Sequence, residues 1–331
     1  MPPPERPFPV GRSPRPKQTP LLTPALCAAL LWLTTTSTSA SEAGATSWSL
    51  QAGDRVVLLG DTVIEREGER GVIETALVAA HPGADLTFRN LGWSGDTVWA
   101  ESRGVFDAPS AGYARLLDLV GALRPTVVFV AYGRNESLAG AGGLEAFRVQ
   151  LVRLCSDLRG PAGDGTTPAP RIVLVTPPPI ESTPPLSAAA ADARNRVLTD
   201  YATVIRSVAT EQEAGLVDLF AATTSHLPAG ARLTENGIHL TDAGYGAAAA
   251  VFAASCGKSL SGDHPGRTAA IRAAVNEKNR LFFHRWRPAN ETYLFLFRRH
   301  EQGNNAIEIP QFDALVDAAE AKVWEMARES P

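Results

Sequence analysis

The sequence predicts an α/β fold built on one doubly wound, parallel sheet of five strands. Five short apolar runs, rich in β-branched residues, recur along the chain with helix-like segments between them. The runs are continuously apolar rather than alternating, as expected for strands covered by helices on both faces. The expected strands are 54–60, 85–92, 126–133, 171–177 and 214–220.

Helical periodicity fills the intervals between these runs. The expected helices lie near 67–80, 111–123, 144–158, 188–213 and 242–256. A polar linker at 257–266 ends the sheet domain, and a helix near 268–280, an aromatic and arginine-rich stretch and a helix at 312–328 follow. The predicted domains are therefore a signal peptide (1–40), a linker (41–52), the main domain (53–257) and a C-terminal extension (258–331).

The extension is expected to pack on the main domain, because many aromatic side chains exposed together would favour aggregation. The side chains expected to make this contact are Phe282, Phe283, Trp286, Phe295 and Phe297.

The first forty residues have the pattern of a secretory signal. Four basic residues precede an apolar run at 21–33, and small residues follow it up to Ala40. The run is shorter than the roughly 20 residues that a membrane-spanning helix needs. We therefore expect a secreted or periplasmic protein with no stable membrane span after signal cleavage. An uncleaved anchor and a misplaced start codon are the alternatives.

Charge and cysteine content restrict the partners. Loss of residues 1–40 would remove four of the 31 basic and one of the 35 acidic residues, which changes the net charge from −4 to −7. This charge does not favour nucleic acid as a partner. Cys155 and Cys256 are expected to be buried free thiols, with a disulfide between them as the alternative. The histidines have no metal-ligand spacing, so neither a metal site nor a cofactor is predicted.

Polar and glycine-rich segments follow four of the predicted strands. They are "GDT" (60–62), "NLGWSGDT" (90–97), "YGRNES" (132–137) and "LTENGIHLTDAGY" (233–245). Ligands of open α/β sheets bind outside the carboxyl ends of the strands, so these segments are the candidate site.

Taken in order, the segments resemble the four sequence blocks of the SGNH/GDSL hydrolase superfamily, which are flavodoxin-like secreted esterases and lipases. "LLGDTVIERE" matches the first block, "NLGWSGDT" the second, "AYGRNES" the third and "NGIHLTDAGY" the last. The resemblance covers about residues 53–256 and implies the flavodoxin-like SGNH hydrolase fold and acyl transfer to water. The extension lies outside this core and resembles extensions on secreted proteins of planctomycete-type bacteria.

The resemblance implies a role for each matched residue. Thr62 takes the nucleophile position and His239 the general-base position. The backbone N–H groups of Thr62 and Gly95 and the side-chain amide of Asn135 take the oxyanion-hole positions. Such donors stabilise the negative charge that develops on an ester carbonyl oxygen, and histidine can exchange a proton near neutral pH.

Two positions depart from the family pattern. Thr62 replaces Ser, and its β-methyl group crowds the attacking oxygen. Asn236 replaces the Asp that orients the histidine; its carbonyl can accept from the ring N–H but cannot stabilise an imidazolium ion. In the serine-protease triad the same change lowers kcat about 10⁴-fold. Glu235 is the alternative carboxylate, and Asp242 is expected to cap the helix that follows.

Five neighbouring residues are predicted to support the site or bind the substrate: Asp61, Trp93, Ser94, Arg134 and Glu136. Trp93 is expected either to line the cleft or to pack against the sheet edge. Arg134 is expected to pair with Glu136 or another nearby acid.

The leading hypothesis is a secreted ester hydrolase that acts on a small-molecule or glycan ester through a hydroxyl nucleophile. A catalytically silent domain that binds a glycan and an acyltransferase with the same site residues are the alternatives. We expect Thr62 to be a slow but genuine nucleophile, because the position keeps a hydroxyl group and the donors and base that would serve it are present.

Overall fold

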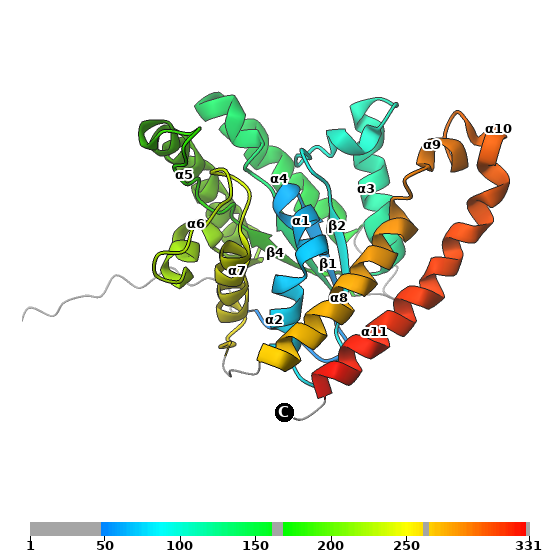
Figure 1. Ribbon diagram of the computed structural model, residues 1–331. Helices are drawn as coiled ribbons and strands as arrows, with labels where there is room; N and C mark the ends of the chain where they lie inside the picture. The colour runs from blue at the N-terminus through cyan, green and yellow to red at the C-terminus, as the bar shows by residue number, and fades with distance from the viewer. Residues whose placement is uncertain (1–47, 161–167, 261–264, 329–331) are drawn as a thin grey trace, which may run out of the picture. The chain divides into compact units, whose positions relative to one another are not determined.

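The computed structural model describes residues 48–160, 168–260 and 265–328. The predicted signal peptide and most of the predicted linker lie outside these residues. The described chain forms a five-stranded parallel sheet in the order β2-β1-β3-β4-β5 (Figure 1), which confirms the predicted fold class. The strands are β1 (Arg55–Gly60), β2 (Thr87–Gly92), β3 (Val127–Ala131), β4 (Arg171–Val175) and β5 (Gly215–Val217).

The helices alternate with the strands and then continue alone. The α-helices of the main domain are α1 (Thr62–Arg70), α2 (Val72–Ala80), α3 (Pro109–Leu123), α4 (Leu144–Arg159), α5 (Ala188–Glu211), α6 (Leu219–Ala222) and α7 (Asp242–Ser255). Those of the extension are α8 (Pro265–Trp286), α9 (Glu291–Leu294), α10 (Arg299–Gln302) and α11 (Phe312–Arg328). The 3₁₀ helices are η1 (Glu101–Gly104), η2 (Glu136–Gly143), η3 (Thr223–His226) and η4 (Gly303–Gln311).

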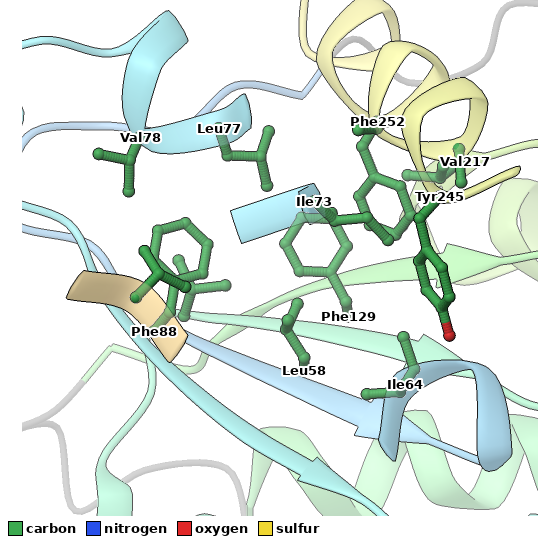
Figure 2. Packing of buried hydrophobic residues seen from close by; sticks show 14 of the residues in the cluster. Leu58, Ile64, Ile73, Leu77, Val78, Phe88, Phe129, Val217, Tyr245 and Phe252 are labelled. Carbon is green, nitrogen blue, oxygen red and sulfur yellow. The ribbon is translucent and has the colours of Figure 1, made fainter. Parts of the chain in front are cut away.

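The central strand buries side chains on both faces of the sheet. Val56 and Leu58 point into the core formed with α1, α2 and α7, part of which is seen in Figure 2. Val57 and Leu59 point into the opposite core, formed with α3, α4 and α5. Because alternate residues of a strand face opposite sides, two covered faces require the continuous apolar run seen in the sequence.

The predicted helix at 67–80 covers the end of α1 and the whole of α2, and α1 begins earlier than expected, at Thr62. Asp61 caps α1, and its side chain accepts a hydrogen bond from the Val63 backbone N–H at 3.0 Å. The helix ends at Gly71, whose φ of 62° suits a residue without a Cβ atom, and α2 begins directly after it. Capping therefore places the first turn of α1 at the carboxyl end of β1, where Thr62 is the first helical residue.

The extension contacts the main domain through buried polar groups on two helices. Lys278 of α8 is fully buried, and its Nζ atom lies 2.8 Å from both the Glu74 carboxylate and the Phe88 carbonyl oxygen. Trp324 of α11 donates from Nε1 to the Leu86 carbonyl at 2.7 Å. In Figure 1, α8 and α11 lie side by side along the β2 side of the sheet.

The aromatic side chains of the extension divide into two groups. Phe282 is buried, and Trp286 packs against the core that α3, α4 and α5 form with the sheet. Phe283, Phe295 and Phe297 are exposed and lie outside the buried core. The Phe297 ring nevertheless packs edge-on against Phe106 of the main domain, with centroids 5.3 Å apart, as expected. Phe283 lies on α8, whereas Phe295 and Phe297 lie between α9 and α10.

The described residues show the state of the two cysteines and whether any helix could span a membrane. Cys155 and Cys256 are both buried free thiols, as expected. No helix within 48–160, 168–260 or 265–328 combines the length and apolar character needed to cross a bilayer.

Candidate active site

The sheet register brings the first three sequence segments to one edge. Gly60, the last residue of β1, pairs with Gly92 of β2 on one side and with Ala131 of β3 on the other. All three strands run parallel, so the loops after these residues begin side by side. The strand order reverses at β1, because β2 lies on one side of it and β3 to β5 on the other, and ligands of such sheets bind at this topological switch point.

Thr62 and Gly95 meet at this edge. The Gly95 backbone N–H lies 3.4 Å from the Thr62 Oγ1 atom, and Thr62 is partly exposed. As the first residue of α1, Thr62 has a backbone N–H without an intrahelical partner, at the positive end of the helix dipole. Gly95 has a φ of 77°, a conformation that glycine adopts without strain. Two backbone donors are therefore available beside one hydroxyl group.

Asn135 is tied to the same loop. Its Nδ2 atom donates to the carbonyl oxygen of Asp96, the residue after Gly95, at 2.7 Å. A side-chain amide nitrogen carries two hydrogens, so one remains for another acceptor. The structure thus places Gly95 beside Thr62 and ties Asn135 to the residue that follows Gly95.

The buried side chain of Glu136 connects the loop after β2 with the loop after β3. Its carboxylate accepts from the Val98 and Gly133 backbone N–H groups, both at 2.7 Å. Burial raises the pKa of Glu136 to about 7. The predicted ion pair between Arg134 and Glu136 is absent from the described residues, because Glu136 turns towards these backbone donors.

Arg134 is a buried cation without an ion-pair partner in the described residues. Its Nη2 atom donates to the Pro178 carbonyl oxygen at 2.6 Å, whereas Nε and Nη1 lack a hydrogen-bond partner in the described part of the chain. Burial lowers its pKa, and the charge of Asp61 opposes this effect. Burial likewise raises the pKa of Asp61. The prediction that Arg134 forms an ion pair with a neighbouring acid is therefore wrong.

A buried ion pair beneath the loop was missed by the sequence analysis. Asp96 is fully buried and lies 2.7 Å from Arg103 Nε and 3.0 Å from the Tyr132 hydroxyl group. Arg103 also donates to the Leu91 carbonyl at 2.8 Å. The sequence signal that could have indicated this ion pair is the second "GDT" triplet (95–97), because it places Asp96 in a loop at the end of a strand. The partners of Asp96 are Arg103 on η1 and Tyr132, which follows β3 directly. The triplet alone does not indicate either of them.

His239 lies in the loop before α7, and this loop packs against α1. The Tyr245 hydroxyl of α7 donates to the Val63 carbonyl at 2.8 Å, one residue after Thr62. Glu235 forms ion pairs with Arg66 at 3.1 Å and Arg70 at 2.6 Å, both on α1. Glu235 is therefore engaged by arginines and does not replace the missing aspartate at His239.

Asn236 contacts the His239 ring through its amide nitrogen and not through its carbonyl oxygen. Its Oδ1 atom accepts from the backbone N–H groups of Ile238 at 3.2 Å and His239 at 3.0 Å. These two donors orient the amide, so Nδ2 faces the His239 Nδ1 atom at 3.1 Å. An amide nitrogen only donates, and Nδ1 must therefore accept. The expectation that the Asn236 carbonyl accepts from the ring N–H is wrong, because that carbonyl is already used by the backbone.

The capping of α7 also differs from the prediction. Thr241 is the cap, and its hydroxyl oxygen accepts from the Gly244 backbone N–H at 3.0 Å. Asp242 is the first helical residue and forms an ion pair with Arg70. The extended backbone of Thr241 places its side chain at the helix end, which explains the difference of one residue.

The electrostatic environment lowers the pKa of His239 and so favours its neutral form. Partial burial lowers the pKa of His239, and the positive charges of Arg66 and Arg134 lower it further. The Glu235 carboxylate acts in the opposite direction. At neutral pH the ring is therefore uncharged, with one nitrogen protonated.

The remaining predicted residues lie beside Gly95. Ser94 is exposed, and its backbone N–H donates to the Glu65 carboxylate of α1. The Trp93 ring packs against Trp286 of the extension at a centroid distance of 5.9 Å, so it contacts the extension rather than only the sheet edge. No group of three or more potential metal-ligating side chains occurs in the part of the chain that the structure describes.

These features define a class: a doubly wound α/β domain with a hydroxyl group, two backbone donors and an amide at the carboxyl edge of its sheet. The chain belongs to the GDSL-like lipase/acylhydrolase family, whose model matches residues 58–247. The matched region contains all four sequence segments. No curated protein matches the chain.

Solved structures share this fold. The acetylxylan esterase Axe2 from Geobacillus stearothermophilus is 19% identical, with a TM-score of 0.51 over 66% of this chain and 100% of that chain. BT4096, a diltiazem-metabolizing enzyme from a gut microbe, is 12% identical, with a TM-score of 0.63 over 86% of this chain and 98% of that chain. At these identities the comparisons establish the fold alone, and the second similarity extends well beyond the family region.

Proposed function

We propose that this protein hydrolyses acyl esters and that an acylated carbohydrate is its substrate class. The observation that carries the proposal is the Thr62 hydroxyl group at the start of α1, 3.4 Å from the Gly95 N–H. Membership of the family supports the reaction type. The preference for a carbohydrate ester is supported by the acetylxylan esterase of the same fold. We also propose that the protein is secreted.

In the proposed reaction, the Thr62 Oγ1 atom attacks the acyl carbon and its proton passes to His239. The carbonyl oxygen becomes negative and accepts hydrogen bonds from the Thr62 and Gly95 N–H groups and from the free hydrogen of Asn135 Nδ2. The tetrahedral intermediate expels the alcohol, which takes the proton from His239. Water then attacks the acyl-threonine by the same route and releases the acid.

The contact between Asn236 and His239 makes this proton transfer slow. A ring whose Nδ1 accepts from Asn236 carries its proton on Nε2, which then has no lone pair for the Thr62 proton. The reactive tautomer must give up the Asn236 hydrogen bond and place its Nδ1–H against an amide donor. Loss of one such bond costs about 1–3 kcal/mol, or roughly 5- to 150-fold in population.

The same contact favours the second candidate, a silent domain that binds a glycan without cleaving it. In that case the neutral Nε2–H group of His239 and the donors around Thr62 bind substrate hydroxyl or carbonyl oxygens. An acyltransferase would use the same residues with a sugar hydroxyl in place of water. Among residues 48–160, 168–260 and 265–328, no contact favours an acyltransferase over a hydrolase.

Turnover of p-nitrophenyl acetate by the purified protein tests the first candidate against the second. We expect slow hydrolysis that Thr62→Ala and His239→Ala each abolish and that Thr62→Ser preserves or increases, because the β-methyl group is removed. Ser225→Ala, which alters an exposed hydroxyl bonded to the Ala222 carbonyl, is the control. Turnover that is unchanged by Thr62→Ala would remove Thr62 from the mechanism. Background-level turnover together with glycan binding favours the silent domain.

The pH dependence of kcat/KM should follow the lowered pKa of His239. The ring acts as a base only when neutral, so activity is lost as the pH falls through the pKa of His239. Burial and Arg66 lower that pKa, which places the acid limb below the ordinary histidine value of about 6.5.

Arg66→Met should move the acid limb to higher pH, because it removes a positive charge near the ring. Arg70→Met is the matched control, since Arg70 also pairs with Glu235 but does not contribute to the shift at His239. An acid limb that stays in place in Arg66→Met contradicts the assignment of His239 as the titrating base.

A further inference from the structure

We propose that Arg287 of the C-terminal extension is a positioning residue for the oxyanion hole. It follows α8 directly and would act on Gly95 through Trp93 and Glu65. This inference rests on the proposed function, because the oxyanion hole matters only for an acyl-transfer site. It adds that the extension, which lies outside residues 58–247 of the family match, is needed for full activity.

The loop that carries Gly95 is anchored at Asp96 by Arg103, Tyr132 and Asn135, but its tip at Ser94 and Gly95 has few anchors. Ser94 and Gly95 are exposed, and a Cβ atom built on Gly95 would meet no other atom within 4 Å. Within the loop, the Trp93 N–H donates to the Gly60 carbonyl and the Asp96 N–H to the Trp93 carbonyl, each at 3.0 Å. The tip between these two bonds therefore depends on outside contacts for its position.

Glu65 supplies one outside contact. Its carboxylate accepts from the Ser94 backbone N–H, directly before Gly95. The Arg287 Nη1 atom lies 3.5 Å from the same carboxylate oxygen, and both side chains are about three-quarters buried. A carboxylate on α1 can rotate about its own side-chain bonds. The guanidinium group restricts that rotation and keeps the acceptor pointed at Ser94.

Trp93 supplies the second contact. The guanidinium carbon of Arg287 lies 3.6 Å from the centroid of the Trp93 ring, within the range of a strong cation–π interaction. Arg103 lies 5.5 Å from the same centroid, and the Trp286 ring packs at 5.9 Å. Arg287 therefore contacts both residues that hold the loop tip, one through charge and one through its planar face.

The expected kinetic effect follows from the geometry of oxyanion donors. Such a donor must lie about 3 Å from the developing oxyanion, and a displacement of about 1 Å can cost 10²-fold in rate. The ground-state ester binds these donors weakly, so loss of position reduces kcat more than it raises KM. Arg287 itself touches no reacting atom in this account.

The test compares Arg287→Met with Arg280→Met in the full-length protein. Methionine retains the apolar stem but removes the charge and the planar group. Arg280 lies on α8, the helix that ends directly before Arg287; it is exposed and pairs only with Glu277, one turn earlier, in the described structure. With p-nitrophenyl acetate, Arg287→Met should lower kcat by about tenfold or more and change KM less than about twofold. Arg280→Met should leave both constants unchanged.

Amide hydrogen exchange of the peptide covering 93–97 gives a readout that does not depend on hydrolysis. Exchange should accelerate in Arg287→Met and remain unchanged in Arg280→Met. Glu65→Gln, which keeps an acceptor for Ser94 but loses the charge that binds Arg287, should accelerate it less. Arg287→Lys should restore only part of the protection, because lysine keeps the charge without the planar fork.

The outcomes separate this inference from the proposed function. If no variant hydrolyses the ester but exchange accelerates in Arg287→Met and not in Arg280→Met, the hydrolase proposal fails and the positioning contact stands. If Arg287→Met matches Arg280→Met in both kcat and exchange, the inference is overturned. A rise in KM without a fall in kcat also overturns it, because that result places Arg287 in substrate binding.

Discussion

Asn236→Asp should raise kcat by about 10²- to 10⁴-fold in a Thr62→Ser background. An aspartate at this position can accept the Ile238 and His239 backbone N–H groups with one oxygen, as Asn236 does now. Its second oxygen would then face the His239 Nδ1 atom as an acceptor instead of a donor. The ring proton moves to Nδ1, Nε2 gains the lone pair that general-base catalysis requires, and the carboxylate stabilises the imidazolium ion.

In the unaltered Thr62 background the gain should be smaller. The β-methyl group of Thr62 and the Asn236 contact both hinder the same proton transfer, so the two substitutions are not additive. Kinetics of the two single variants and the double variant measure the coupling. Asn236→Ala removes the amide donor without adding a charge. Any gain in kcat that it gives measures the release of the unreactive tautomer, and the further gain in Asn236→Asp measures stabilisation of the imidazolium ion.

Nitrogen-15 chemical shifts of the His239 ring test the cause directly. The unaltered protein should show a proton on Nε2, and Asn236→Asp should show it on Nδ1. A proton on Nδ1 in the unaltered protein would contradict the explanation, even if Asn236→Asp were faster. Such a result would mean that the charge of the aspartate alone matters.

Lys278→Met should reduce the free energy of unfolding by about 3–5 kcal/mol, because it leaves Glu74 buried without its partner. Lys278 is 0% exposed and Glu74 1%, with 2.8 Å between Nζ and the carboxylate. Chemical denaturation of the full-length protein measures the change. Replacing both residues, as Lys278→Met/Glu74→Met, should recover most of the loss, since no buried charge is then left unpaired.

The destabilisation by Lys278→Met should depend on pH with a defined sign. Burial raises the pKa of Glu74, and loss of the lysine charge raises it further. A carboxyl group with a raised pKa in the folded state costs stability when it must ionise. The defect should therefore be largest at high pH and shrink as the pH falls towards the unfolded-state value of about 4.3.

Arg280→Met is the control for stability as well as for catalysis, because its pair with Glu277 is exposed and should contribute little. A defect in Lys278→Met no larger than that of Arg280→Met would mean that the buried pair does not hold α8 on the domain. Equal defects in Lys278→Met and in the double variant would show that the loss arises from packing and not from the unpaired charge.

Local sequence patterns determined the fold class and the position of the candidate site. Buried parallel strands require continuous apolar runs, so all five strands were found within a few residues, and the helix at 312–328 was found with its observed ends. Parallel strands share one carboxyl edge, so the segments with Thr62, Gly95 and Asn135 were placed together correctly. The break between α1 and α2 at Gly71 was missed because an isolated glycine can be tolerated inside a helix as well as end one.

Tertiary structure alone decided how the side chains of the site are used. The Asn236 amide is oriented by two backbone N–H groups of its own turn, and which of its atoms faces His239 depends on that loop geometry. Arg287 reaches Glu65 across 222 positions of the chain, and Lys278 reaches Glu74 from another helix. Periodicity records which face of an element is buried. It does not record which buried donors and acceptors meet, because those pairings depend on rotamers and on elements that come together only when the chain folds.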